Sequence, residues 1–427
     1  MLQLGLLDPL TAVVISFCFL GVLLYRRVNL GITLNATAVL LALLSLNWRR
    51  IPSIVYATVD PFKSEGLLAI SVILATFGIM WLSQLYKETG EITKLSESLS
   101  RIVKNPKIVL SVLPAVIGFL PVAGGALMSA PIVDSEAEKL KLKPERKAYV
   151  NLWFRHTIFP VYPLSQVLIV TAALTGTALF SIILLQIPTV IVMVVVGFFV
   201  GFWKIPSVKN GKDSETIKNN AGLELKRFLI SFSPIMATIV VAIFIDALSY
   251  GLSKLGFDVL IATFAGLVAL VIISRMNREI LVKPFKEWGI YGVTLAVYGA
   301  FLLRNVMVAS GVSEIFKQFV ANESVDVTLP LTIIPAVLGF LTGSPLGAIA
   351  ISVPILKAGV LTFSPKTAAL LYISAYLGYT ISPTHLCFTF TADYFKSPLG
   401  RVYKYVIPSF IATFATAVLV YFLPFSI

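Results

Sequence analysis

The sequence PAVIGFL at 114–120 recurs as PAVLGFL at 335–341, with six of seven residues identical at an offset of 221. Further matches run in the same order at offsets of 221 to 223: PFKSEG at 61–66 with PFKEWG at 284–289, SAP at 129–131 with SVP at 352–354, and KP at 143–144 with SP at 364–365. Self-similarity at a constant offset indicates a repeated structural unit. We therefore expect two copies of one unit, 1–206 and 223–427, joined by the polar linker 207–222.

The composition predicts an integral membrane protein. Of 427 residues, 57% are hydrophobic and 13% are charged, and the mean hydropathy is +0.91, which is too apolar for a chain folded around one core in water. The net charge of +13 comes from basic residues in the short connections between apolar runs, which is typical of topology signals and not of nucleic-acid binding. The two cysteines, Cys18 and Cys387, both lie in apolar runs and predict neither a disulfide framework nor a CxxC metal site.

Ten apolar runs are each close to the roughly 20 residues that a helix needs to cross a bilayer. They are 10–24, 30–47, 67–86, 147–172, 179–203, 228–250, 257–274, 288–309, 367–393 and 403–424. The first run has no basic segment before it and no small-residue cleavage site after it, so we expect a retained span and not a signal peptide.

Two further apolar stretches, 108–133 and 329–356, carry prolines and glycines near their centres. Each half is about ten to fourteen residues, or roughly 15–20 Å of helix, which reaches only the middle of a bilayer. Such stretches form either re-entrant hairpins or kinked spans. Hairpins place 25 lysines and arginines on one side of the membrane and 7 on the other, whereas spans give 20 and 12. The positive-inside rule therefore favours hairpins, with both termini extracytoplasmic in the cell membrane and the linker cytoplasmic.

Each copy then holds five spans and one hairpin, and an odd number of crossings inverts the second copy. Two spans are interrupted, by FPVYP at 159–163 and by TISPTH at 380–385. The predicted fold class is an all-α polytopic membrane protein of two inverted repeats, each of five transmembrane helices plus one re-entrant hairpin, with interrupted helices at the midplane. This architecture is typical of alternating-access secondary transporters.

The hairpin tips and helix breaks expose backbone groups at one depth, where N–H groups suit a carboxylate and carbonyl oxygens suit Na⁺. Small residues at the tips favour close approach of a ligand, although glycine and serine also serve tight helix packing. The candidate substrate-binding residues at the tips and breaks are Val122, Ala123, Gly124, Gly125, Ser129, Pro160, Tyr162, Thr342, Gly343, Ser344, Gly347, Ser382 and Thr384. Candidate Na⁺ positions are Gly124, Gly343, Ser344 and Thr380.

Ionisable residues inside spans predict the sign of the substrate. Arg155 and His156 precede the first break, and Arg304 lies beside Asn305 within 288–309, with no equally deep carboxylate in the sequence. Two buried cations without an acidic partner favour an anionic substrate, the alternative being that each arginine snorkels or binds carbonyl groups. His156 and His385, the only histidines, both flank breaks, which favours proton coupling or, alternatively, hydrogen-bonded packing. All five residues are candidates for substrate binding.

Two segments, 87–105 and 310–320, are amphipathic and precede the two hairpins. Their pattern predicts helices that lie along the bilayer surface, either as braces for a moving domain or as simple connections. Motifs for hydrolases, metalloproteases or nucleotide binding are absent from the sequence, so we expect no enzyme activity and no cofactor.

The chain resembles the ion transporter superfamily, which includes divalent anion–sodium symporters, citrate–proton symporters and gluconate permeases. The segment GFLPVAGGALMSAP at 118–131, followed by FRH at 154–156 and PVYP at 160–163, is similar to an uncharacterised branch near the gluconate permeases. The resemblance implies an elevator mechanism and a homodimer. The dicarboxylate branch carries Ser-Asn-Thr at both tips, whereas here those positions read VAG at 122–124 and GSP at 343–345, so its side-chain contacts do not transfer.

The sequence thus predicts an ion-coupled secondary active transporter of a small organic anion, a carboxylate, with Na⁺ or H⁺ as the coupling ion. The expected partners are this anion and the lipid bilayer, with no nucleic acid. The alternatives are a cation–proton antiporter of the same superfamily, which needs a deep carboxylate, and an intramembrane enzyme.

Overall fold

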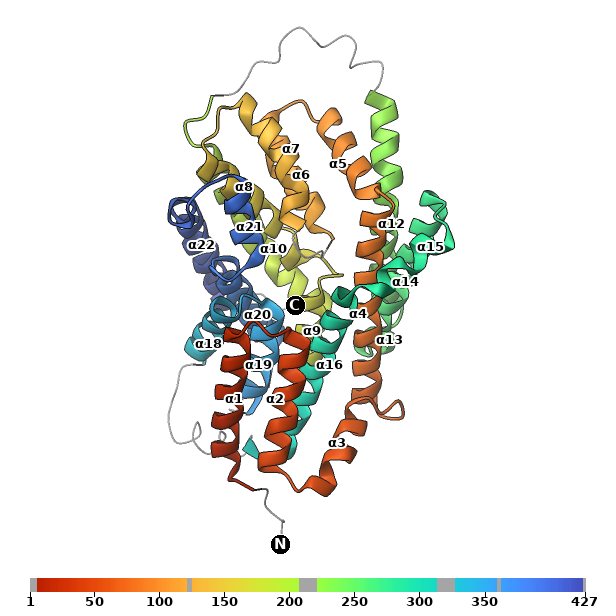
Figure 1. Ribbon diagram of the computed structural model, residues 1–427, viewed down its shortest axis with the longest axis vertical. Coiled ribbons are helices and arrows are strands. Elements are labelled where there is room, and N and C mark those ends of the chain that lie inside the picture. Colours follow the sequence, from red (N-terminus) through yellow and green to blue (C-terminus); the bar gives the residue numbers. More distant parts are fainter. Residues whose placement is uncertain (1–5, 121–124, 207–220, 313–326, 359–361, 425–427) are drawn as a thin grey trace.

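The computed structural model describes residues 6–120, 125–206, 221–312, 327–358 and 362–424 (Figure 1). These residues form α-helices and short 3₁₀ segments, and none of them is in a strand. The predicted all-α class is confirmed.

The helices follow the apolar runs of the sequence closely. In the first half they are α1 (Pro9–Tyr25), α2 (Leu30–Ser45), η1 (Trp48–Arg50), α3 (Ile51–Thr58), α4 (Ser64–Glu88), α5 (Glu91–Ile102), α6 (Pro106–Gly118), α7 (Gly125–Lys139), α8 (Pro144–His156), η2 (Phe159–Val161), α9 (Gln166–Thr175) and α10 (Leu179–Phe202). In the second half they are α12 (Ala221–Leu248), α13 (Tyr250–Lys254), α14 (Phe257–Ser274), α15 (Arg278–Val282), η3 (Lys283–Lys286), α16 (Trp288–Ala309), α18 (Thr328–Thr342), α19 (Pro345–Ala358), α20 (Pro365–Thr380), α21 (Leu386–Tyr394) and α22 (Leu399–Phe422).

Seven helical segments in the described part of the chain are long and apolar enough to cross a membrane, so the protein is membrane-embedded. They are α4, α8 with α9, α10, α12, α14, α16 and α22. Of the other three predicted spans, α1 and α2 are shorter, with 17 and 16 residues, and the third is divided into α20 and α21. The number of ten crossings stays a prediction.

Local sequence explains where several helices begin. The Asp8 carboxylate accepts from the Thr11 N–H at 3.0 Å at the start of α1, and the Asn105 side chain accepts from the Lys107 N–H at 3.0 Å before α6. Ser364 and Thr367 form a capping box before α20. Both α8 and α20 have proline as their first residue, which is where the repeated KP and SP dipeptides lie.

Both predicted hairpin stretches form pairs of short helices. α6 contacts α7, α18 contacts α19, and the two pairs lie toward opposite ends of the long axis (Figure 1). Pro114, Pro131, Pro335 and Pro354 lie inside these helices, and Pro345 is the first residue of α19. Residues 121–124, between α6 and α7, lie outside the described residues. Gly343 separates α18 from α19 with φ +59°, a backbone conformation that glycine adopts without strain.

The helices form two bundles. The first bundle contains α1, α2, α3, α4, α5, α12, α14 and α16, and the second contains α6 to α10 and α18 to α22. Several contacts have an equivalent in which each helix is replaced by its counterpart from the other half of the chain. The contact of α2 with α16 corresponds to that of α14 with α4, that of α6 with α8 to that of α18 with α20, and that of α7 with α21 to that of α19 with α9. The bundles meet mainly where α16 contacts α19, α5 contacts α6 and α4 contacts α9.

Glycines allow the closest helix contacts in the second bundle. A Cβ atom at Gly339 of α18 would lie 2.2 Å from the Ala375 carbonyl oxygen, and one at Gly378 of α20 would lie 2.1 Å from that of Ala336. The repeat equivalent of Gly339 is Gly118 on α6, where a Cβ atom would lie 2.5 Å from the Arg155 carbonyl oxygen on α8. The repeated PAVxGFL sequence is therefore a helix-packing sequence.

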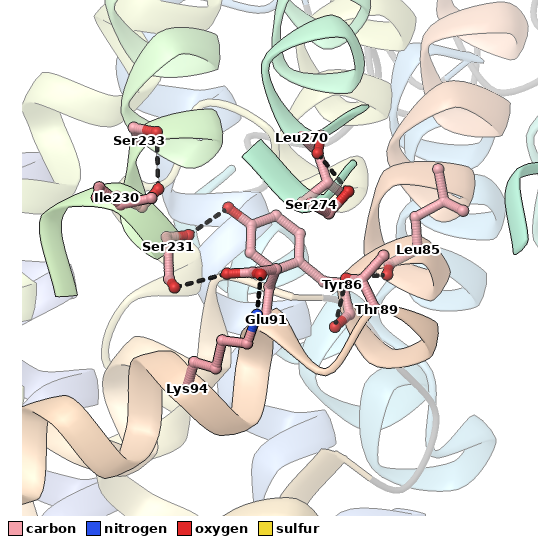
Figure 2. A network of polar contacts seen from close by, with 10 residues as sticks. All are labelled: Leu85, Tyr86, Thr89, Glu91, Lys94, Ile230, Ser231, Ser233, Leu270 and Ser274. Atoms are coloured by element: carbon pink, nitrogen blue, oxygen red, sulfur yellow. Dashed lines mark hydrogen bonds and ion pairs between the residues drawn. The ribbon is translucent and has the colours of Figure 1, made fainter. Parts of the chain in front are cut away.

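The amphipathic helix α5 buries one face against the protein. Its residues Ile92, Leu95 and Leu99 are buried, and α5 contacts α12 and α6. Figure 2 shows the polar link to α12: the Ser231 hydroxyl donates to the buried Glu91 carboxylate at 2.6 Å, and Lys94 binds the same carboxylate at 2.7 Å. A position along the bilayer surface stays a prediction for α5. The second amphipathic segment falls largely on 313–326, outside the described residues.

Candidate functional site

The two helix interruptions bring one residue cluster together. α8 ends at His156, and α21 begins after His385. The two imidazole ring centroids lie 4.8 Å apart in an edge-to-face arrangement, although 229 positions separate the residues in sequence. Each histidine is only 1% exposed. We call Arg155, His156, His385 and Cys387 the interruption cluster.

Arg155 is the charged member of this cluster and is 2% exposed. Its Nη2 donates to the Leu120 carbonyl oxygen, at the end of α6, at 3.2 Å. Its Nε and Nη1 atoms are buried and have no hydrogen-bond partner among the described residues, and no carboxylate there forms an ion pair with it. An unpaired buried donor costs roughly 1–3 kcal/mol, more when it is charged, so an anion that reached these nitrogens would be bound strongly.

The histidines differ in their hydrogen bonding. His156 Nδ1 lies 2.7 Å from the Leu152 carbonyl oxygen, one turn earlier in α8. Neither ring nitrogen of His385 has a hydrogen-bond partner among the described residues, although the backbone of Thr380 lies near this ring. Around them stand Phe159, Tyr376 and Tyr379, with the Tyr379 ring centroid 3.9 Å from that of His385. The polar side chains of the interruption cluster are thus surrounded by aromatic rings.

The second hairpin tip contacts the second interruption directly. A Cβ atom at Gly343 would lie 2.5 Å from Thr384 Oγ1, and the Ser382 and Thr384 hydroxyls lie 2.8 Å apart. Thr342 Oγ1 accepts from the Ser344 N–H at 3.2 Å, and Ser344 Oγ accepts from the Gly347 N–H at 3.1 Å. The fold therefore joins all of the predicted residues of this tip and break, and many of their polar groups bind each other.

The first tip is described only from Gly125 onward, because Val122, Ala123 and Gly124 lie outside the described residues. Gly125 is buried at the start of α7. The Ser129 hydroxyl donates to Asn151 Oδ1 at 2.6 Å, and Asn151 Nδ2 donates to the Ala126 carbonyl oxygen at 2.8 Å. Asn151 lies one turn before Arg155 on α8 and fixes α7 against α8, a role that the sequence analysis missed.

The other predicted residues have different neighbours. Pro160 is buried in η2, and the Tyr162 ring packs edge-on against Phe119 with centroids 4.9 Å apart. These contacts do not join either residue to the interruption cluster. For the Na⁺ candidate Thr380, the hydroxyl donates to the Tyr376 carbonyl oxygen at 2.8 Å within α20.

Arg304 and Asn305 lie on α16, where Arg304 faces the start of α4 and Asn305 faces the end of α3. Arg304 Nη2 is 3.7 Å from a Glu65 carboxylate oxygen, and Asn305 Nδ2 donates to Thr58 Oγ1 at 3.1 Å. Asn305 lines a cavity of about 600 Å³ with Ile54, Ala57, Lys63, Ser64, Glu65, Val308 and Ala309. The expectation that Arg304 has no acidic partner is wrong, because the fold brings Glu65 to it from 239 positions away.

One known family matches nearly the whole chain. The family described as "Protein of unknown function (DUF401)" matches residues 10–423. The chain belongs to the DUF401 family. Comparison with curated proteins gives no match. The match spans both halves of the chain and includes every residue of the interruption cluster.

Cys387 is the member of the interruption cluster that sequence analysis missed in this DUF401 protein. The absence of a CxxC motif excludes only metal sites that are local in sequence, whereas Cys387 meets His156 through the fold. The signal available in the sequence was its position two residues after His385, just beyond the second interruption.

Proposed function

We propose that this DUF401 protein is an ion-coupled secondary active transporter that moves a small organic anion, a carboxylate, by alternating access. The observation that carries the proposal is Arg155 at the meeting point of two interrupted helices, a buried guanidinium with two nitrogens that have no hydrogen-bond partner among the described residues. A permanently charged arginine in a membrane interior marks a ligand pathway more often than a packing position. The planar donor group suits a carboxylate, which can accept two N–H bonds at once.

The proposal includes two inverted repeats with re-entrant hairpins, and the helix lengths and contacts support it. The four hairpin helices have 13 to 15 residues, or roughly 20 Å, so each reaches about halfway through a bilayer. The paired contacts between equivalent helices and the opposite positions of the two hairpins agree with halves that are related by a two-fold axis in the membrane plane. Interrupted helices from both halves then enclose a site at mid-depth.

The two bundles suit an elevator. The second bundle holds both hairpins, both interruptions and the whole interruption cluster, and it contacts the first bundle through few helix pairs. Movement of the second bundle along a fixed first bundle would carry a bound anion across the membrane. We include the homodimer in the proposal, with the first bundle as the part in contact with a partner, and we place the protein in the cell membrane with both termini outside.

Na⁺ and H⁺ remain the two proposed coupling ions. A cation–proton antiporter would instead need a carboxylate in the site. The buried carboxylates among the described residues are Asp60, Glu91, Glu224 and Asp258, and all four have partners elsewhere. Asp60 accepts from the Phe62 N–H, Glu91 binds Ser231 and Lys94, Glu224 pairs with Arg101, and Asp258 accepts from the Ser253 hydroxyl at 3.1 Å. These contacts favour an anion as the transported substrate.

Transport in proteoliposomes tests the proposal. Full-length protein in liposomes should accumulate at least one labelled acid from a panel of gluconate, lactate and dicarboxylates when a Na⁺ or H⁺ gradient is imposed. Protein-free liposomes and proteoliposomes without a gradient should not accumulate it. Cation exchange without uptake of any anion in any gradient would refute the proposal.

A further inference from the structure

We propose that His156, His385 and Cys387 form a binding site for a borderline-soft divalent metal ion, for which Zn²⁺ is the best match. One ligand atom from each residue lies within 4.8 Å of the other two. Imidazole nitrogen and thiolate sulfur are the ligands that Zn²⁺ prefers over the oxygen-binding ions Na⁺, Mg²⁺ and Ca²⁺. This site goes beyond the proposed transport function and does not depend on it.

The hydrogen bond of His156 fixes the tautomer that a metal ligand needs. A carbonyl oxygen cannot donate, so the 2.7 Å contact with Leu152 requires the proton on His156 Nδ1. The neutral ring then carries its lone pair on Nε2. Metal-bound histidines in proteins typically donate their second nitrogen to a carbonyl or carboxylate in this way, which fixes both tautomer and ring direction.

His385, at the second interruption, and Cys387, in the first turn of α21, supply the other two ligands. His385 is 1% exposed, and neither ring nitrogen makes a hydrogen bond of normal geometry among the described residues, with the Thr380 backbone nearby, so a bound metal would give a well-placed partner to a buried polar ring. Cys387 follows two residues later in α21. Its thiol would lose its proton to solvent on binding, because the thiolate is the form that ligates metals.

The geometry needs only a small adjustment. Tetrahedral Zn²⁺ with the usual bond lengths places ligand atoms roughly 3.3–3.6 Å apart. The ligand atoms of the three residues are at most 4.8 Å apart, so each pair must approach by about 1.5 Å or less. Rotation of an imidazole about its side-chain bonds can supply this movement. Three protein ligands leave the fourth position open.

Arg155 determines what can occupy the open position. Its guanidinium is adjacent to His156 in sequence and would repel a bound cation, while the Cys387 thiolate offsets one unit of that positive charge. An exogenous anion at the fourth position would reduce the remaining repulsion between the metal and Arg155. Chloride or a carboxylate fits this position chemically.

Cobalt titration tests the metal site directly. Co²⁺ replaces Zn²⁺ with the same ligands and reports thiolate ligation through a near-ultraviolet charge-transfer band, and tetrahedral geometry through intense visible bands. We expect the full-length protein in detergent to bind one Co²⁺ per chain with both signals, and Zn²⁺ to displace it. Absence of the charge-transfer band in the wild-type protein would overturn the proposal.

Matched variants identify the ligands. Cys387→Ser should remove the charge-transfer band and weaken metal binding by at least about 100-fold, since a directly bound ligand matters at least as much as its outer-shell supports. Cys18→Ser, at the exposed cysteine of α1, should change neither signal. His385→Ala should weaken binding similarly, and if it fails to fold, Cys387→Ser still tests the site because serine has nearly the same shape. An unchanged band in Cys387→Ser would contradict the assignment.

Arg155→Ala separates this proposal from the transport proposal. Loss of the guanidinium should leave cobalt binding intact or strengthen it, because a neighbouring positive charge is removed, whereas anion binding should be lost. Loss of the cobalt signals in Arg155→Ala with retention of anion binding would contradict the metal assignment.

Discussion

Replacing Arg155 by methionine should weaken binding of the transported anion by roughly 10- to 150-fold, which corresponds to the 1.5–3 kcal/mol of a hydrogen bond to a charged group. Methionine fills much of the arginine volume, so the fold should remain, and removal of a buried charge that pairs with no described carboxylate should not lower stability. The measurement is the rise in unfolding temperature of pure protein with each acid of the uptake panel, since a ligand that binds only the folded state stabilises it.

Arg146→Met is the matched control for this prediction. Arg146 lies on the same helix, where it contacts Tyr405 and the Trp203 carbonyl oxygen, away from the interruption cluster. We expect its affinity for the anion to stay near the wild-type value. Unchanged affinity in Arg155→Met together with a large loss in Arg304→Met would move the anion site to α16.

Gly378→Ala should destabilise the protein by about 1–3 kcal/mol, the usual cost of overpacking a well-packed interface. The added methyl carbon would lie 2.1 Å from the Ala336 carbonyl oxygen, and backbone atoms of both α18 and α20 would have to move apart. Gly339→Ala should act similarly, because its methyl carbon would lie 2.2 Å from the Ala375 carbonyl oxygen. Thermal unfolding of the pure variants measures this effect.

Gly21→Ala provides the comparison at an unconstrained helical glycine. No atom lies within 4 Å of a Cβ at this position of α1, so alanine should be neutral or slightly stabilising through its higher helix propensity. If Gly378→Ala and Gly21→Ala unfolded at the same temperature, the close packing of α18 on α20 would be wrong.

Hydropathy predicted the positions of individual helices well. The runs 257–274 and 288–309 coincide with α14 and α16, and 179–203 differs from α10 by one residue. The ends of α14 and α16 are set by polar or glycine residues next to long apolar runs, which is information local in sequence. The interruptions at Phe159–Pro163 and Thr380–His385 were visible from their prolines, which remove a helical hydrogen bond. Proline alone does not decide this, because Pro188 of α10 and Pro408 of α22 lie inside continuous helices.

Pairing between distant residues was not predictable from such local patterns. Glu65 and Arg304 come from different halves, and nothing in the periodicity of either segment indicates their ion pair. Likewise, the sequence around Asn151 does not indicate its hydrogen bond with Ser129, which forms because α7 packs against α8. Helix α5 was predicted correctly as amphipathic, but the burial of Glu91 depends on Ser231 of α12, which its own sequence cannot specify.

The opposite orientation of the two halves is the central claim, and cysteine labelling tests it most directly. In a background with both native cysteines replaced by serine, Lys141→Cys and Thr362→Cys each place one thiol at an exposed position after a hairpin. A membrane-impermeant maleimide added to intact cells should label Thr362→Cys at once and Lys141→Cys only after permeabilisation. Labelling of both thiols from the same side of the membrane would contradict the inverted arrangement and the shared site that depends on it.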